Sequence, residues 1–167
     1  TDQDFEVAEE AILEVMKEHP EVRLKLVGVL SDRKMEKFGN KVEKLTFMDW
    51  KQLPSVMAGI DINLMPLEDS IFHCSKSENK WMEAALVKVP SVMSRNREMK
   101  GVIENGVDGW LCSDKEEWKK ALTTLIEEKT ARVQMGEKAH KKVMCQYVTQ
   151  NTGKDAREEL LCSEKYS

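Results

Sequence analysis

The sequence reads IDINLMP at residues 60–66, SENKWMEAALV at 77–87 and VPSVMS at 89–94. The first and third stretches are short and rich in aliphatic and β-branched residues, which is typical of buried strands. The middle stretch has the length of a helix, and its Ala84 and Ala85 allow close packing on a sheet. A strand, a helix and a second strand in this order predict a parallel α/β arrangement, because parallel strands need a long crossover between them.

The same alternation extends to both sides of this stretch. Apolar residues recur at steps of three and four from Phe5 onward, which predicts a first helix that ends at Pro20. A capping-box pattern at Ser113 and Glu116 predicts the start of another helix, and Thr130 is expected to cap the next one, which runs to about residue 147. Further strands are predicted at residues 23–30, 42–47 and 109–112, further helices at 50–59 and 100–104, and a charged connection at 32–41.

These elements predict one α/β domain over residues 1–167, a Rossmann-like, doubly wound parallel sheet flanked by helices. Residues 149–167 are expected to form a C-terminal helix or a frayed tail. The chain opens in a helix, whereas an α/β nucleotide-binding domain normally begins with a strand. We therefore expect that the first strand of the domain lies outside this sequence.

Composition excludes several classes of protein. Lysine and arginine number 26 against 30 aspartates and glutamates, so the net charge of −4 does not favour binding to nucleic acid. The cysteines are far apart and form no Cys-x-x-Cys pair, which argues against a zinc site or a disulfide framework. No apolar run approaches the roughly 20 residues of a transmembrane helix. A cytoplasmic location is expected.

The most unusual connection lies between the strand at 60–66 and the helix at 77–87. It is longer than the roughly 2–6 residues typical of such loops, and it leads to a helix start whose free amides and dipole favour an anion. Ser75, Ser77 and Lys80 would add hydroxyls and a cation, so a diphosphate would fit here. The alternative is that Ser77 is only a helix cap and Lys80 a solvated side chain.

Glu83 lies on the same predicted helix and has two interpretations. Its carboxylate would suit two hydroxyl groups of a ribose, or it would pair on the surface with Lys80 or Lys88. His73 in the preceding loop would either approach a substrate or remain solvated. The sequence contains no recognisable Ser/His/Asp arrangement or metal-ligand spacing, so the catalytic residues are unknown and no metal is expected.

Four segments in series resemble a known family. They are LPSVMAGIDINLMPL at residues 53–67, SKSENKWMEAA at 75–85, VPSV at 89–92 and IENGVDGWL at 103–111. Their order and spacing resemble the C-terminal domain of retaining glycosyltransferases of the GT-B fold, family GT4. The resemblance covers roughly residues 4–147.

The resemblance implies a domain that binds a nucleotide-diphosphate sugar, UDP- or GDP-linked, as substrate and holds no cofactor. It implies that Glu83 binds the ribose, that the segment at about 68–80 surrounds the sugar and phosphates, and that residues 47–53, ending at Leu53, lie near the base. It also implies sugar transfer with retention, usually without a metal. The acceptor would be held by an N-terminal domain outside this sequence, through which the full protein would contact the inner face of the membrane.

Two positions depart from the family pattern. The family commonly has a glutamate eight positions before the ribose-binding one, where this chain has Ser75, so that contact to the sugar is absent or is supplied by Glu78 or another loop residue. Lys88 stands where many members have glycine. The sequence KWME at 80–83 resembles a subgroup found beside bacterial surface-polysaccharide genes. The chain by itself is expected to be inactive; the alternatives are half of a sugar-nucleotide epimerase or a catalytically inactive regulatory or scaffolding domain.

Overall fold

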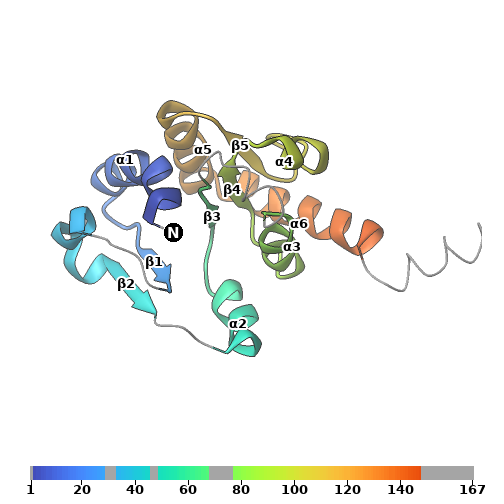
Figure 1. The fold of residues 1–167 in the computed structure, drawn as a ribbon, viewed down its shortest axis with the longest axis horizontal. Coiled ribbons are helices and arrows are strands. Elements are labelled where there is room, and N and C mark those ends of the chain that lie inside the picture. The colour runs from blue at the N-terminus through green and yellow to red at the C-terminus, as the bar shows by residue number, and fades with distance from the viewer. Residues whose placement is uncertain (1, 29–32, 46–48, 68–76, 148–167) are drawn as a thin grey trace, which may run out of the picture.

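The computed structural model describes residues 2–28, 33–45, 49–67 and 77–147, in which helices and strands alternate (Figure 1). The α-helices are α1 (Asp2–Glu18), α2 (Leu53–Ala58), α3 (Ser77–Leu86), α4 (Arg97–Val102), α5 (Lys115–Glu127) and α6 (Lys129–Gln146). The strands are β1 (Leu24–Val27), β2 (Val42–Leu45), β3 (Asn63–Met65), β4 (Ser91–Ser94) and β5 (Trp110–Cys112). Two 3-10 helices, η1 (Arg33–Lys41) and η2 (Trp50–Gln52), precede β2 and α2.

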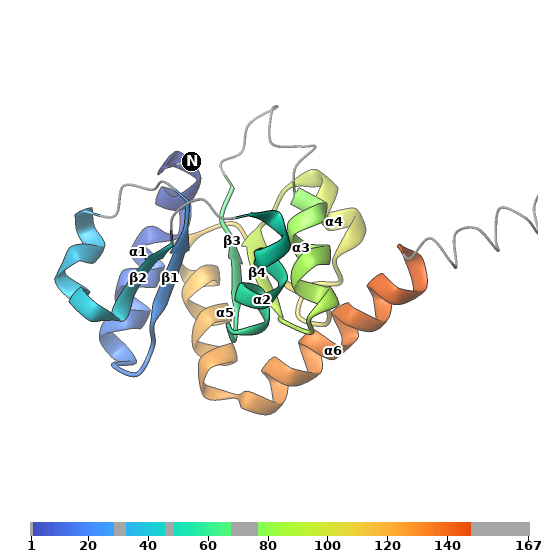
Figure 2. The same ribbon diagram turned by 90° about the horizontal axis from the view of Figure 1, so that it is seen from below.

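Every strand pairing among the described residues is parallel, as the sequence predicts. The strands nevertheless form two sheets, β1–β2 and β3–β4–β5, because β1 and β3 are not hydrogen-bonded to each other. Both views show β1 and β3 side by side, with β2 on the far side of β1 (Figures 1 and 2). In the doubly wound order 3-2-1-4-5-6, the first strand lies between the second and the fourth strands. The first strand expected outside this sequence remains a prediction.

The direction of the backbone amides follows from the pairing. The amide of Gly28 donates to the carbonyl of Leu45 at 2.9 Å, and the amide of Asn63 donates to the carbonyl of Pro90 at 2.9 Å. Because amides alternate in direction along a strand, the intervening amides of β1 and β3 point into the space between the two sheets. These gap-facing amides belong to Lys25 and Val27 of β1, to Leu64 of β3 and to Ile62, which directly precedes β3.

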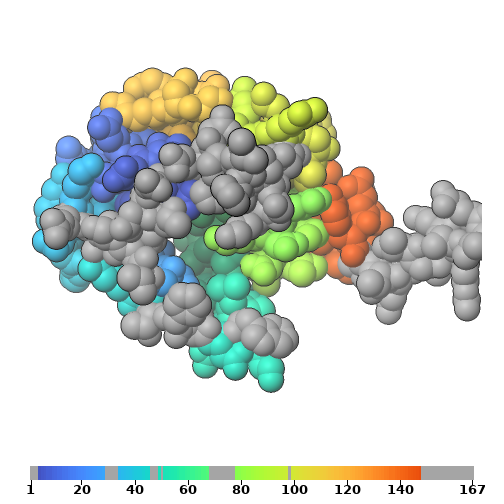
Figure 3. Space-filling model, viewed as in Figure 1, coloured from blue at the N-terminus to red at the C-terminus, as the bar shows by residue number. Residues whose placement is uncertain are grey.

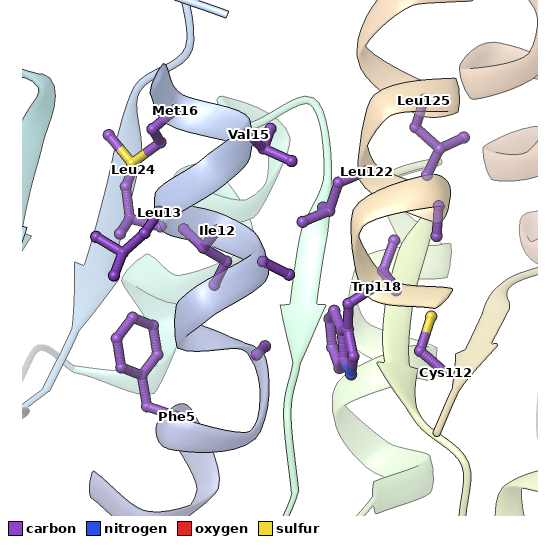
Figure 4. Close-up of a cluster of buried hydrophobic side chains, with 14 of the residues drawn as sticks. Phe5, Ile12, Leu13, Val15, Met16, Leu24, Cys112, Trp118, Leu122 and Leu125 are labelled. Atoms are coloured by element: carbon purple, nitrogen blue, oxygen red, sulfur yellow. The ribbon is translucent and has the colours of Figure 1, made fainter. Parts of the chain in front are cut away.

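Neighbouring side chains of the three-stranded sheet enter two different cores. Val92 and Cys112 pack with α1 and α5, whereas Met93 and Leu111 pack with α3, α4 and α6. Figure 4 shows the first core, in which the side chains of α1 and α5 approach each other. The sheet is therefore buried on both faces, which explains why β4 has four buried residues in a row.

The predicted capping box of α5 is shifted by one residue. The N-cap is Asp114, whose carboxylate accepts a hydrogen bond from the amide of Glu117 at 2.8 Å. The side chain of Glu117 in turn accepts from the amide of Ser113 at 2.7 Å. The prediction that Ser113 and Glu116 form the pair is wrong, because Asp114 has the extended backbone of an N-cap and Glu117 lies three residues beyond it.

Other predicted boundaries also differ from the structure. The charged connection at 32–41 contains η1, and α6 begins at Lys129 with Glu128 rather than Thr130 as its N-cap. No side-chain hydrogen bond caps that start, since α6 follows α5 almost directly. The predicted tail at 149–167 lies outside the described residues. In the described part of the chain, no helix has both the length and the apolar character needed to cross a bilayer.

Candidate functional site

Because β3, β4 and β5 are parallel, their carboxyl ends lie at one edge of the sheet. Helices α3 and α4 begin near this edge (Figure 2). The buried hydroxyl of Ser94, the last residue of β4, accepts a hydrogen bond from the amide of Leu67 at 2.8 Å. The next residue, Arg95, donates its amide to the carbonyl of Cys112 at 2.8 Å and its guanidinium to that of Leu111 at 2.9 Å. These bonds fix where the loops leave the sheet, at the edge where α/β domains hold their ligands.

Helix α3 carries most of the predicted site residues and divides them between two flanks. Lys80 and Glu83 are both exposed, and at 100° per residue they lie about 60° apart around the helix. Glu78 is half-buried and lies about 160° from Lys80. Lys80 and Glu83 therefore share one flank, and Glu78 lies on the other. Ser77 is the first residue of the helix, and Ser75 lies outside the described residues, as does His73.

Helix α2 borders the flank of α3 that carries Lys80. A small apolar cluster joins Met57 of α2 to Ala84 of α3, and Ala84 lies about 40° from Lys80 around the helix. Leu53, the first residue of α2, is half-buried and packs against this cluster. In the space-filling view α2 stands beside α3 at the rim of the molecule (Figure 3). The structure therefore brings Leu53 and Lys80 to the same side of α3.

The centre of α3 is anchored by a buried polar network. The indole Nε1 of Trp81, a fully buried side chain, donates to the carbonyl of Asp108 at 3.1 Å. The carboxylate of Asp108 accepts from the amide of Glu104 at 2.9 Å and from the ammonium of Lys142 at 2.6 Å. Lys142 also lies 5.9 Å from the centroid of the Trp81 ring. Because Asp108 is only 4% exposed, this pairing offsets the cost of burying its charge, and it fixes α3 against the loop before β5.

Sequence reasoning assigned no role to Asp108, Lys142 or Tyr147. The hydroxyl of Tyr147 donates to Oε1 of Glu78 at 2.6 Å, across 69 positions of sequence. Only Asp108 carried a local signal, because an Asp-Gly pair is typical of a turn. Its neighbour Gly109 is closely packed, since an added Cβ would lie 3.0 Å from Cε of Met93 and 3.1 Å from Cγ2 of Ile103.

The remaining chemistry-bearing groups of the described residues are few. Burial raises the pKa of the Cys112 thiol to about 12, so this side chain stays neutral and is a poor nucleophile. Among the residues that the structure describes, no three His, Cys, Asp or Glu side chains are grouped as metal ligands would be. The candidate site therefore comprises the start of α3, its exposed Lys80 and Glu83, and the neighbouring α2.

A parallel α/β domain with helices on both faces and a helix start at the carboxyl edge of its sheet is a Rossmann-like domain, as predicted. Comparison with known proteins defines the family. Residues 2–128 match the family model of the group 1 glycosyl transferases, and the chain belongs to that family. The fold is that of the C-terminal domain of a GT-B glycosyltransferase.

Solved structures with the same fold have low sequence identity. The C-terminal domain of a group 1 glycosyl transferase from Francisella tularensis is 17% identical with a TM-score of 0.70, and the match covers 84% of this chain and 77% of that one. The HepE protein of Anabaena, solved with UDP and glucose, is 19% identical with a TM-score of 0.70, over 93% of this chain and 44% of that one. A putative UDP-N-acetylglucosamine 2-epimerase from Listeria monocytogenes is 18% identical with a TM-score of 0.62, and the match covers 82% of this chain and 36% of that one.

The chain thus spans less than half the length of the Anabaena and Listeria proteins that it resembles. A search of curated proteins gave no match.

Proposed function

We propose that this chain binds the nucleotide-diphosphate sugar donor of a glycosyltransferase that transfers the sugar, with retention of configuration, to a glycan or lipid acceptor. Membership of the group 1 glycosyl transferases carries the proposal, because members of this family transfer sugars. The solved structure of the Anabaena protein with UDP and glucose supports a UDP-linked donor, although GDP is the alternative to be compared in the experiment.

The proposed roles of the residues follow their positions. The amides of the first turn of α3, near Ser77, and the ammonium of Lys80 would meet the diphosphate, because the positive end of a helix dipole favours an anion. Glu83, one turn further along the same flank, would accept hydrogen bonds from the ribose hydroxyls. Leu53 on the neighbouring α2 would lie toward the base. Amides and a lysine would carry the charge of the leaving diphosphate without a metal.

The complete enzyme would need a second domain. We propose that an N-terminal domain holds the acceptor, completes the catalytic cleft and makes any contact with the inner face of the cytoplasmic membrane. The chain alone would then bind a nucleotide sugar without turnover. Assignment to family GT4 belongs to the same proposal and rests on the four segments between residues 53 and 111. Assignment to bacterial surface-polysaccharide synthesis rests on the pattern KWME at 80–83.

The test is a calorimetric titration of this chain with UDP, GDP and their sugar conjugates. Glu83→Ala should weaken binding of the preferred nucleotide roughly 10- to 100-fold, because hydrogen bonds to a charged group contribute about 1.5–3 kcal/mol. Glu137→Ala, which removes an exposed glutamate of α6, is the matched control and should leave the affinity unchanged. Equal affinity of the parent chain and Glu83→Ala would refute the proposed contact between Glu83 and the ribose.

Two other functions are the alternatives to this proposal, and each has its own test. The similarity to a putative UDP-N-acetylglucosamine 2-epimerase favours an epimerase half as the second candidate, and formation of a second sugar epimer by the full-length protein would identify it. Ser75, at the position where the family commonly has glutamate, leaves open an inactive regulatory or scaffolding domain. Absence of binding to any nucleotide, in a protein that also contains the first strand, would favour that alternative.

A further inference from the structure

Helix α6 contacts α3 at both ends and in the middle. Near the last turn of α3, Nδ1 of His140 is hydrogen-bonded to the carbonyl of Ala85 at 3.1 Å. At the centre, Lys142 lies over the ring of Trp81. At the first turn, Tyr147 reaches α3 from the residue that directly follows α6. Helix α6 and the residue that follows it therefore contact α3 along its whole length, and each of the three contacts can be removed by a separate substitution.

The contact at the first turn is a charge-assisted hydrogen bond. The hydroxyl of Tyr147 donates to Oε1 of Glu78 at 2.6 Å, a length typical of a hydroxyl bound to a carboxylate. The ring of Tyr147 also meets Trp81 edge-on, with a centroid distance of 6.3 Å and an interplanar angle of 75°. Burial, with the Glu78 carboxylate, raises the pKa of Tyr147 to about 12, so the phenol stays protonated and donates at neutral pH.

We infer that Tyr147 is a positioning residue of the nucleotide-sugar site. Through Glu78 it holds the first turn of α3 in place, so that the amides of that turn and Lys80 present one fixed geometry to the diphosphate. This inference rests on the proposed function. It also gives Glu78 a defined role: its Oε1 is held by Tyr147 on the flank that faces α6, about 160° around the helix from Lys80.

The geometry explains why this bond is suited to positioning. The first turn of a helix has amides without intrahelical partners, and helix ends fray more readily than helix centres. A bond from a neighbouring element to a side chain of that turn restricts this fraying without occupying the amides. Because Tyr147 approaches from the flank opposite Lys80, it leaves the ligand side of the turn open.

The test compares Tyr147→Phe with His140→Ala. Tyr147→Phe keeps the ring that packs on Trp81 and removes only the hydroxyl, whereas His140→Ala removes the contact at the far end of α3. We expect Tyr147→Phe to raise the dissociation constant of UDP at least about fivefold, the low end of coupling between linked positions. His140→Ala should leave it unchanged. In a Glu78→Gln background, the effect of Tyr147→Phe should shrink, because the charged acceptor is gone.

Hydrogen exchange of the α3 amides provides a second readout that needs no ligand. Tyr147→Phe should speed exchange at Lys80 and Trp81 and leave Ala85 unchanged, while His140→Ala should do the reverse. If both variants weaken UDP binding equally, or if Tyr147→Phe changes neither exchange nor affinity, the inference is wrong. If the parent chain binds no UDP but the amides of Lys80 and Trp81 still exchange faster in Tyr147→Phe, the proposed function fails while the positioning of α3 by Tyr147 stands.

Discussion

Replacement of Gly136 by alanine tests how closely α6 approaches the rest of the domain. A Cβ at this position would overlap the carbonyl oxygen of Lys88 and lie 2.8 Å from its carbonyl carbon and 3.4 Å from Cδ of Pro90. The obstacle is the backbone of the turn between α3 and β4, which cannot rotate away as a side chain would. Helix α6 must therefore move outward, and its contacts with α3 must loosen.

The magnitude follows from two opposing effects. Alanine is favoured over glycine in a helix interior by about 1 kcal/mol. Overpacking of a close contact typically costs about 1–3 kcal/mol and occasionally more. Since the clash at Gly136 is with backbone, we take the upper part of that range, which leaves a net loss of about 1–2 kcal/mol in the free energy of unfolding.

Urea unfolding followed by circular dichroism measures this loss, and the chain contains a matched control. Gly101 lies in α4, is exposed, and has no heavy atom within 4 Å of an added Cβ. Gly101→Ala should therefore keep the gain in helix propensity, up to about 1 kcal/mol. If Gly136→Ala is as stable as Gly101→Ala, the close approach of α6 to the turn at Lys88 is refuted.

Three further predictions concern other parts of the fold. Lys88 has a φ of 61°, a left-handed backbone that costs about 1–2 kcal/mol for a residue with a Cβ. Glycine avoids this cost but loses more chain entropy on folding, so Lys88→Gly should raise the free energy of unfolding by about 0.5–1 kcal/mol. An unchanged urea midpoint would contradict this. Iodoacetamide at pH 8 should alkylate the exposed Cys145 and leave the buried Cys112 unmodified until the chain unfolds, as mass spectrometry of digests would report; equal labelling would contradict the burial and the raised pKa of Cys112. The gap-facing amides of Lys25, Val27, Ile62 and Leu64 should exchange with solvent faster than the amides of Leu26 and Asn63, which are hydrogen-bonded within the sheets. Equal protection measured by NMR would contradict this, because it would mean that the four amides also have hydrogen-bond partners.

Local pattern was sufficient for the fold class. Short apolar runs and helical spacing predicted the parallel strands and the helices that cover them, and the burial of Val92, Trp118 and Leu122 agrees with that pattern. The series of segments from residue 53 to residue 111 also predicted a GT-B glycosyltransferase domain, which the match over residues 2–128 to the group 1 glycosyl transferases confirms. Helix ends were predicted less well, because Ser113 and Asp114 are both good caps, and their backbone conformation decides between them.

The tertiary structure decided which distant residues contact one another. Residues 78, 80 and 83 lie within six positions of the sequence, and helical spacing already separates them. Only the packing of α3 shows that the flank of Lys80 borders α2 and that Glu78 is bound by Tyr147. The partners of α3 at 108, 142 and 147 are brought to it by the return of α6, and no local pattern encodes a contact across that distance. The separation of β1 from β3 likewise depends on strand pairing, which is set by long-range hydrogen bonds rather than by the residues of either strand alone.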